Sequence, residues 1–158
     1  KKAGIALAYK AVEAKDKVGL IVFGTEVKDS VAPSDDFGRL LVGISGIKAS
    51  METNMHLGIK KAVELFPSEN LTKHLIILTD AMPTVGKEPE KETLEAVSSA
   101  RNSGITVSVI GIKLDKKAAK FAEEIALIGE GRFYVVRDVK NLDMVVLDDY
   151  YSAKTLFP

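Results

Sequence analysis

Residues 74–80 read HLIILTD, four aliphatic residues in a row that end in a threonine and an aspartate. An unbroken apolar run of this length, without polar residues in alternation, is typical of a strand buried on both faces of a parallel sheet. Three other segments have the same character: 17–23 (KVGLIVF), 105–112 (ITVSVIGI) and 132–136 (RFYVV). We therefore expect four interior strands.

Segments with apolar residues at helical spacing separate these strands, and Gly, Pro or a capping residue marks most of their ends. We expect helices over residues 1–15, 37–44, 53–66 with Thr53 as N-cap, 89–103, 118–128 and 141–150 with Asn141 as cap. The polar, alternating residues 26–31 predict a short antiparallel edge strand that Pro33 ends. The pattern predicts a doubly wound, mostly parallel α/β sheet with helices on both faces, as one domain over residues 1–154 and a tail over 155–158.

The composition excludes several classes of function. Lys plus Arg equals Asp plus Glu, at 22 each in 158 residues, so no net charge draws the chain to nucleic acid or to an anionic membrane. There is no Cys, hence no disulfide and no thiolate metal site, which suits a reducing compartment. The apolar runs are far shorter than the roughly 20 residues that span a bilayer. We expect a cytoplasmic protein without membrane insertion.

Several phrases, taken in order, resemble the von Willebrand factor type A family. Residues 16–23 resemble its second strand, 52–59 the segment with its metal-site threonine, and 75–80 the strand that ends in its metal-site aspartate. Residues 104–112 and 125–134 resemble its last two strands and part of the helix between them. The resemblance covers essentially the whole chain, although Glu52 and Ala81 stand where the family often has glycine.

A larger departure concerns the family's central first strand, which ends in Asp-x-Ser-x-Ser and has no counterpart in the sequence. The resemblance places that strand between the strands 18–23 and 75–79. Each backbone group left unpaired and buried costs about 1–3 kcal/mol, and a whole domain is stable by only about 5–15 kcal/mol. We therefore expect the chain to be part of a longer polypeptide, or another segment or chain to fill the gap.

The resemblance also implies a metal-dependent interaction site of the MIDAS type. Ligands of open α/β sheets bind at the carboxyl ends of the strands, where Thr53 and Asp80 are expected to converge. A hydroxyl and a carboxylate are hard oxygen ligands that suit Mg²⁺, with Mn²⁺ or Ca²⁺ as substitutes. The remaining ligands are expected upstream of Lys1, and a partner protein's Asp or Glu is expected to complete the shell.

The loops around this ion are expected to contact the partner through Gly24, Thr25, Ser50, Glu52, Asn54, Ala81, Met82 and Thr84. The family suggests a place in a chelatase-like or ATPase-linked assembly, with an ATPase subunit or domain as one candidate partner. A simpler alternative is that Thr53 is only an N-cap and Asp80 only a loop carboxylate bonded to backbone N–H groups, in a degenerate, metal-free site. For the chain taken alone, the metal-free alternative is favoured.

Enzymatic functions of the same fold class lack their motifs. Neither Gly-x-Gly-x-x-Gly after a strand, nor a Walker sequence, nor Gly-x-Ser-x-Gly occurs, so we expect no enzyme activity. A second rival is a phosphoacceptor receiver domain with Asp80 as acceptor and Lys113 as the cation. That family needs paired acidic residues after its first strand, and no strand of the sequence supplies them.

Overall fold

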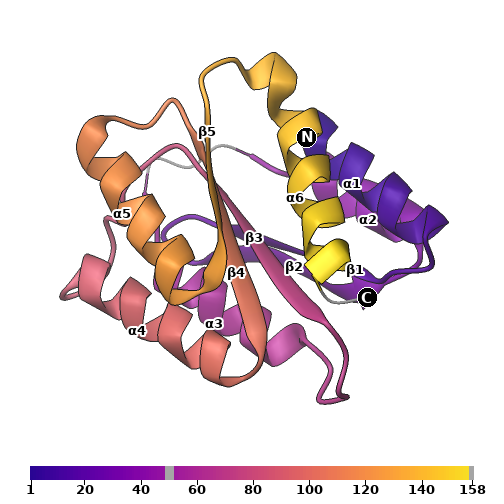
Figure 1. Ribbon diagram of the computed structural model, residues 1–158, viewed down its shortest axis with the longest axis horizontal. Coiled ribbons are helices and arrows are strands. Elements are labelled where there is room, and N and C mark those ends of the chain that lie inside the picture. The colour runs from indigo at the N-terminus through magenta and orange to yellow at the C-terminus, as the bar shows by residue number, and fades with distance from the viewer. Residues whose placement is uncertain (49–51, 157–158) are drawn as a thin grey trace.

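The computed structural model describes residues 1–48 and 52–156 (Figure 1). In chain order the elements are α1 (Lys2–Glu13), β1 (Val18–Phe23), β2 (Val27–Ser34), α2 (Phe37–Ser45), α3 (Met55–Leu65), β3 (Lys73–Thr79), α4 (Pro89–Asn102), β4 (Ile105–Ile112), α5 (Lys116–Ile128), β5 (Glu130–Val136), the 3-10 turn η1 (Val139–Asn141) and α6 (Leu142–Leu156). The predicted order of strands and helices is confirmed, and the fold class is α/β.

The strands form two separate sheets. β3, β4 and β5 make a parallel sheet in that order, and β1 pairs with β2 in antiparallel orientation, as predicted for the edge strand. Helices α3, α4 and α5 cover one face, and α1, α2 and α6 lie on the other (Figure 1). The layers therefore match a doubly wound fold with helices on both faces.

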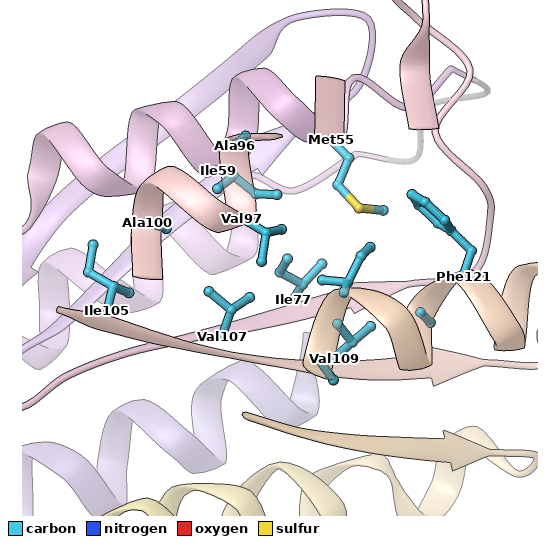
Figure 2. Close-up of a cluster of buried hydrophobic side chains, with 13 residues drawn as sticks. Met55, Ile59, Ile77, Ala96, Val97, Ala100, Ile105, Val107, Val109 and Phe121 are labelled. Carbon is cyan, nitrogen blue, oxygen red and sulfur yellow. The ribbon is translucent and has the colours of Figure 1, made fainter. Parts of the chain in front are cut away.

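The main hydrophobic core lies between the sheet and the α3–α5 layer (Figure 2). Alternate residues of a strand point to opposite faces, so Val107 and Val109 of β4 join this core while Ile110 contacts the α1 and α6 side. All three side chains are fully buried. Strand β4 is thus buried on both faces, as its apolar run predicts.

β1 and β3 are less completely enclosed. Within the described residues, each pairs along one edge only, β1 with β2 and β3 with β4. The apolar residues of β1 are half-buried, and Leu78 of β3 is 39% exposed. The position expected for a central strand is therefore not filled by the described residues, and the sheet is in two parts.

The prediction that Pro33 ends the edge strand was wrong. β2 continues to Ser34, which pairs with Val18. Proline lacks an N–H for a strand ladder but is tolerated on an edge strand. The ladder is irregular beside it at Gly19, where a Cβ atom would lie 3.2 Å from Pro33 Cδ and 3.0 Å from the Val31 carbonyl oxygen.

The last helix also differs from its prediction at both ends. Asn141 is the final residue of the turn η1, and its side chain makes no capping hydrogen bond within the described residues. At the start of η1, the Lys140 N–H donates to the Asp138 side chain at 3.0 Å. At the other end α6 includes Thr155 and Leu156, which the sequence placed in a tail.

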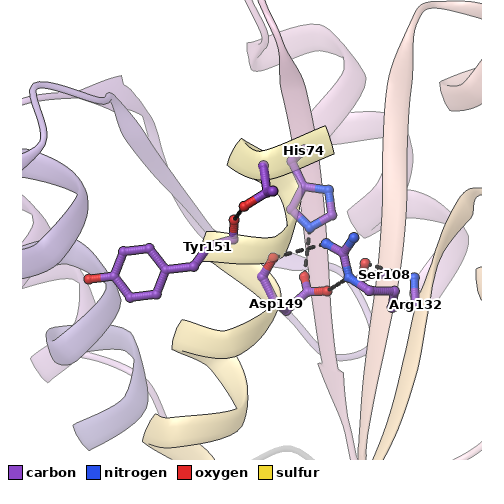
Figure 3. Close-up of polar contacts among 6 residues, drawn as sticks. His74, Ser108, Arg132, Asp149 and Tyr151 are labelled. Atoms are coloured by element: carbon purple, nitrogen blue, oxygen red, sulfur yellow. Dashed lines mark hydrogen bonds and ion pairs between the residues drawn. The ribbon is translucent and has the colours of Figure 1, made fainter. Parts of the chain in front are cut away.

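A buried polar cluster ties α6 to the amino-terminal ends of β3 and β5 (Figure 3). Asp149 is fully buried, and its Oδ2 lies 2.6 Å from His74 Nε2. Arg132 donates from Nε to Asp149 Oδ1 at 2.7 Å and from a terminal nitrogen to the Asp149 carbonyl at 2.9 Å. The Arg132 N–H donates to Ser108 Oγ at 3.0 Å, so β4 joins the cluster as well.

This cluster makes stability depend on pH. Burial alone raises the pKa of Asp149, but the hydrogen bonds and charges of His74 and Arg132 outweigh burial and hold that pKa below its ordinary value. A carboxyl whose pKa is lower in the folded state stabilises the fold above its unfolded pKa of about 3.9. That stabilisation is lost as the pH falls from this value through the lower pKa of the folded protein.

We expect Asp149→Asn to lower the free energy of unfolding at pH 7 by about 3 kcal/mol, because it leaves Arg132 without its buried counter-charge. Denaturant unfolding measures this loss. The matched control is Asp148→Asn on the exposed side of α6, which should change stability by less than about 0.5 kcal/mol. Equal effects of the two substitutions would contradict a special role of the buried pair.

Candidate functional site

Three loops meet at the carboxyl ends of β1 and β3. We call the surface that they form, residues 24–25, 52–54 and 80–88, the three-loop face. The first follows β1 at Gly24 and Thr25, and the second, residues 52–54, leads into α3. Asn54 N–H donates to the Gly24 carbonyl at 2.6 Å, and Asn54 Nδ2 donates to the Thr25 carbonyl at 3.0 Å. The Thr25 hydroxyl donates to Glu52 Oε2 at 2.7 Å. The first two loops are therefore bound to each other by backbone and side-chain hydrogen bonds.

The third loop follows β3 over residues 80–88 and is bound to the second. Thr53 N–H donates to Thr84 Oγ1 at 2.9 Å, and Thr84 N–H donates back to the Thr53 carbonyl at 2.9 Å. Because the second loop touches both neighbours, the ends of β1 and β3 lie on the same side of the fold. Within the described residues, the structure therefore brings the three loops together.

Asp80 lies at the start of the third loop in a tight turn. The Thr79 hydroxyl donates to the Ala81 carbonyl at 2.9 Å and accepts from Ala81 N–H at 3.3 Å, so the two residues that flank Asp80 are joined. Thr79 is buried and Asp80 is exposed. The turn thus directs the carboxylate away from the core, toward solvent.

The N-cap of α3 is Asn54, and the prediction of Thr53 was wrong. Asn54 Oδ1 accepts from Leu57 N–H at 3.3 Å, the bond that defines a side-chain cap. The same side chain donates to the Thr25 carbonyl, and Asn54 is only 4% exposed. Thr53 lies one residue before the cap, and its hydroxyl makes no hydrogen bond within the described residues.

Thr53 and Asp80 therefore carry hard oxygen donors on loops at the same end of the fold, and neither side chain has an internal partner in the part of the chain that the structure describes. This donor chemistry fits Mg²⁺, which prefers oxygen ligands and retains waters. However, residues 1–48 and 52–156 contain no group of three or more His, Cys, Asp or Glu side chains that could hold a metal. Any further ligands would have to come from water, a partner or another segment.

The other residues predicted to contact a partner divide into two groups. Thr25, Glu52 and Thr84 are exposed on the three loops, and Ala81 is half-buried. Gly24 and Asn54 are buried, and Met82 packs against the main core. Ser50 lies outside the described residues. The exposed residues are accessible to a partner, whereas the buried residues hold the loops in place.

Sequence reasoning missed one pair beside the site. The His56 side chain is only 12% exposed, and its Nδ1 lies 3.4 Å from Oε2 of Glu92 on α4. The only signal for Glu92 was an acidic residue in the first turns of a helix, which is common and has no specific meaning. The contact depends on the packing of α3 against α4, which no local pattern reveals.

Residues 5–147 match the model of the von Willebrand factor type A domain. The chain belongs to this family. Among curated protein sequences no match was found. The receiver-domain alternative, with Asp80 and Lys113 as its reactive pair, loses its support because the chain belongs to a different family.

Solved structures of low sequence identity share the fold. BatB, a conserved hypothetical protein from Bacteroides thetaiotaomicron, is 20% identical with a TM-score of 0.75, over 98% of this chain and 87% of that one. The vWF domain of the type V pili tip protein Mfa5 from Porphyromonas gingivalis is 13% identical with a TM-score of 0.79, over 98% and 86%. The pilus adhesin SpaC from Lactobacillus rhamnosus GG is 13% identical with a TM-score of 0.78, over 99% of this chain and 28% of that one.

These neighbours are named as adhesin and pilus proteins or as hypothetical, and they establish the fold alone. Within the described residues, no helix has both the length and the apolar character required to cross a membrane. VWA domains are often protein-interaction modules.

The structure separates the roles of the two neighbouring residues Thr53 and Asn54. We expect Asn54→Ala to destabilise the fold by about 2 kcal/mol, because it removes the α3 cap and a buried hydrogen bond between loops. Thr53→Ala should cost less than about 0.5 kcal/mol, because the hydroxyl makes no internal bond. Urea unfolding of both variants measures the two losses in free energy of unfolding. A larger loss for Thr53→Ala than for Asn54→Ala would contradict the assignment of Asn54 as the cap.

Proposed function

We propose that this VWA domain is a protein-interaction module that binds a carboxylate of a partner protein through Mg²⁺ at the three-loop face. The observation that supports the proposal is that a hydroxyl, Thr53, and a carboxylate, Asp80, belong to loops that hydrogen bonds hold together at the same end of the fold. Neither side chain has an internal task in the described residues. Polar groups held in place at such a face, but not consumed by the fold, are available to a ligand.

The chemistry of the donors explains why a partner carboxylate is expected. Asp80 would supply one negative charge and Thr53 a neutral oxygen, so these two residues leave a divalent cation with net positive charge. When bound, Mg²⁺ would supply a Lewis-acidic site that an anionic oxygen of a partner can enter. Mn²⁺ and Ca²⁺ have the same preference for oxygen and would serve as substitutes, Ca²⁺ with looser geometry.

Specificity would come from the exposed residues around the donors. Thr25 and Glu52 are joined by their side chains on one side of Thr53, and Thr84 lies on the other. Glu52 adds a second carboxylate, which would repel an acidic partner unless a cation lies between them. We further propose that the partner is a subunit or domain of an ATPase-linked or chelatase-like assembly, in a cytoplasmic setting. This finer part rests on family resemblance and on the lack of Cys.

A second candidate is the same module with a metal-free face. It is favoured by the observation that the described residues gather no cluster of three metal-binding side chains. In that case Glu52 and Asp80 would select a basic partner directly. The two candidates differ in their response to chelators and to added metal.

If the metal-dependent candidate holds, 10 mM Mg²⁺ should raise the melting temperature of the full-length protein. For a dissociation constant near 1 mM, binding to the folded state alone predicts a rise of about 3–6 °C. Asp80→Ala should abolish the rise. Asp35→Ala is the matched control, because Asp35 is also an exposed loop aspartate and lies after β2, away from the three loops. An unchanged melting temperature in the unsubstituted protein would contradict metal binding.

The partner-binding prediction uses the same variants. A partner captured on the immobilised full-length protein should be released by EDTA, rebind on addition of Mg²⁺ and fail to bind Asp80→Ala. Capture that survives EDTA but is lost in Glu52→Gln would favour the metal-free candidate. Capture that is insensitive to EDTA and to both substitutions would place the binding on another face.

A further inference from the structure

The third loop is held at a second point, away from Thr84. Both Lys87 N–H and Glu88 N–H donate to Oε1 of Glu92, at 3.0 Å and 3.1 Å. Glu92 lies in the first turns of α4, so its carboxylate folds back over the start of its own helix. One oxygen thereby satisfies two backbone donors at the end of the loop.

Gly86 shows how closely the loop lies against this carboxylate. Its φ of +133° lies in a region that residues with a side chain rarely adopt. A Cβ atom at this position would lie 2.3 Å from Glu92 Oε2, far inside van der Waals contact. The φ angle favours glycine at this position, and any side chain here would force the Glu92 carboxylate to move.

The second oxygen of Glu92 faces α3. His56, in the first turn of α3 and two residues after the cap Asn54, places Nδ1 3.4 Å from Glu92 Oε2. That nitrogen is buried and makes no hydrogen bond within the described residues. The Glu92 carboxylate thus contacts the third loop with one oxygen and the start of α3 with the other.

The carboxylate is suited to this position as an anion. The Glu88 N–H lowers the pKa of Glu92, burial opposes this effect, and the Lys87 N–H and the charges of His56 and Lys60 lower it further. Glu92 is therefore ionised at neutral pH. An anion near the amino terminus of a helix is also favoured by the helix dipole.

We propose that Glu92 is a positioning residue for the three-loop face, acting through the loop 80–88 rather than by touching a ligand. With Thr84 bound to Thr53 at one point and Lys87 and Glu88 bound to Glu92 at the other, the loop is held at both ends of residues 84–88. Loss of the second attachment frees the loop to move at Thr84, and through Thr84 at Thr53. This inference deepens the proposed function and rests on it for its effect on binding.

The test compares hydrogen exchange at single amides, by NMR, in the full-length protein and four variants. Glu92→Ala removes both contacts. Glu92→Gln keeps an oxygen that accepts from Lys87 and Glu88, and Gly86→Ala disturbs the loop while Glu92 stays intact. Glu95→Ala is the matched control, since it removes the same charge from an exposed site one turn further along α4.

In Glu92→Ala and Gly86→Ala we expect the amides of Lys87, Glu88 and Thr84 to exchange about tenfold faster or more, while the amides of β4 keep their rates. In Glu92→Gln the same amides should stay within about threefold of the unsubstituted protein. A titration with MgCl2 alone should show binding about three- to tenfold weaker in Glu92→Ala and restored in Glu92→Gln. If Glu92 only stabilised the fold as a whole, Glu92→Ala would change the exchange rates of all amides together, including those of β4.

The proposal is overturned if the Thr84 amide keeps its exchange rate in Glu92→Ala, because Glu92 would then hold Lys87 and Glu88 without affecting Thr84. It is also overturned if Glu95→Ala has the same effect as Glu92→Ala, because charge alone would then be the cause. The two proposals fail separately. Absence of any Mg²⁺ response in the unsubstituted protein contradicts the proposed function, while the exchange rates still decide whether Glu92 positions the loop.

Discussion

Thr53 and Asn54 form the short segment that joins the two sheets where β1 and β3 end. Asn54 N–H reaches the carbonyl of Gly24 after β1, and the backbone of Thr53 exchanges hydrogen bonds with Thr84 after β3. β1 and β3 share no ladder in the described residues, so these loop contacts and the surrounding helices keep the strands together at this end. The placement of the three loops relative to one another depends on this segment.

Polar interactions at the opposite end of the sheet have a different character. There Asp149 accepts from Arg132 and lies 2.6 Å from His74 in a buried cluster that fastens α6. At the loop end, the side chains of Thr53 and Asp80 are left without partners within the described residues. Paired polar groups in the interior stabilise a fold, whereas exposed polar groups that the fold leaves unpaired are bonded to water and can exchange that water for a ligand.

The sequence predicted the loop end better than it predicted the residue roles within it. The strand termini at Phe23 and Thr79 follow from apolar runs that stop abruptly, so the meeting of their loops could be foreseen. The cap of α3 could not, because Thr and Asn are both good caps and stand side by side. Asn54 takes the role because its amide also reaches Thr25 across the loops, a contact between residues 29 apart in the chain.

By itself, the sequence determined the order of elements, the buried character of β4, the edge position of β2 and the family. The first three features follow from local hydrophobic period and from turn residues, which act over a few neighbours, whereas the family follows from the resemblance of several phrases in order. Only the tertiary structure decided that Asp149 is buried rather than solvated, that Met82 packs into the core and that Glu92 contacts His56. Each of these depends on which helix faces meet across the sheet, and charges and side chains far apart in the sequence find their partners only after that packing is complete.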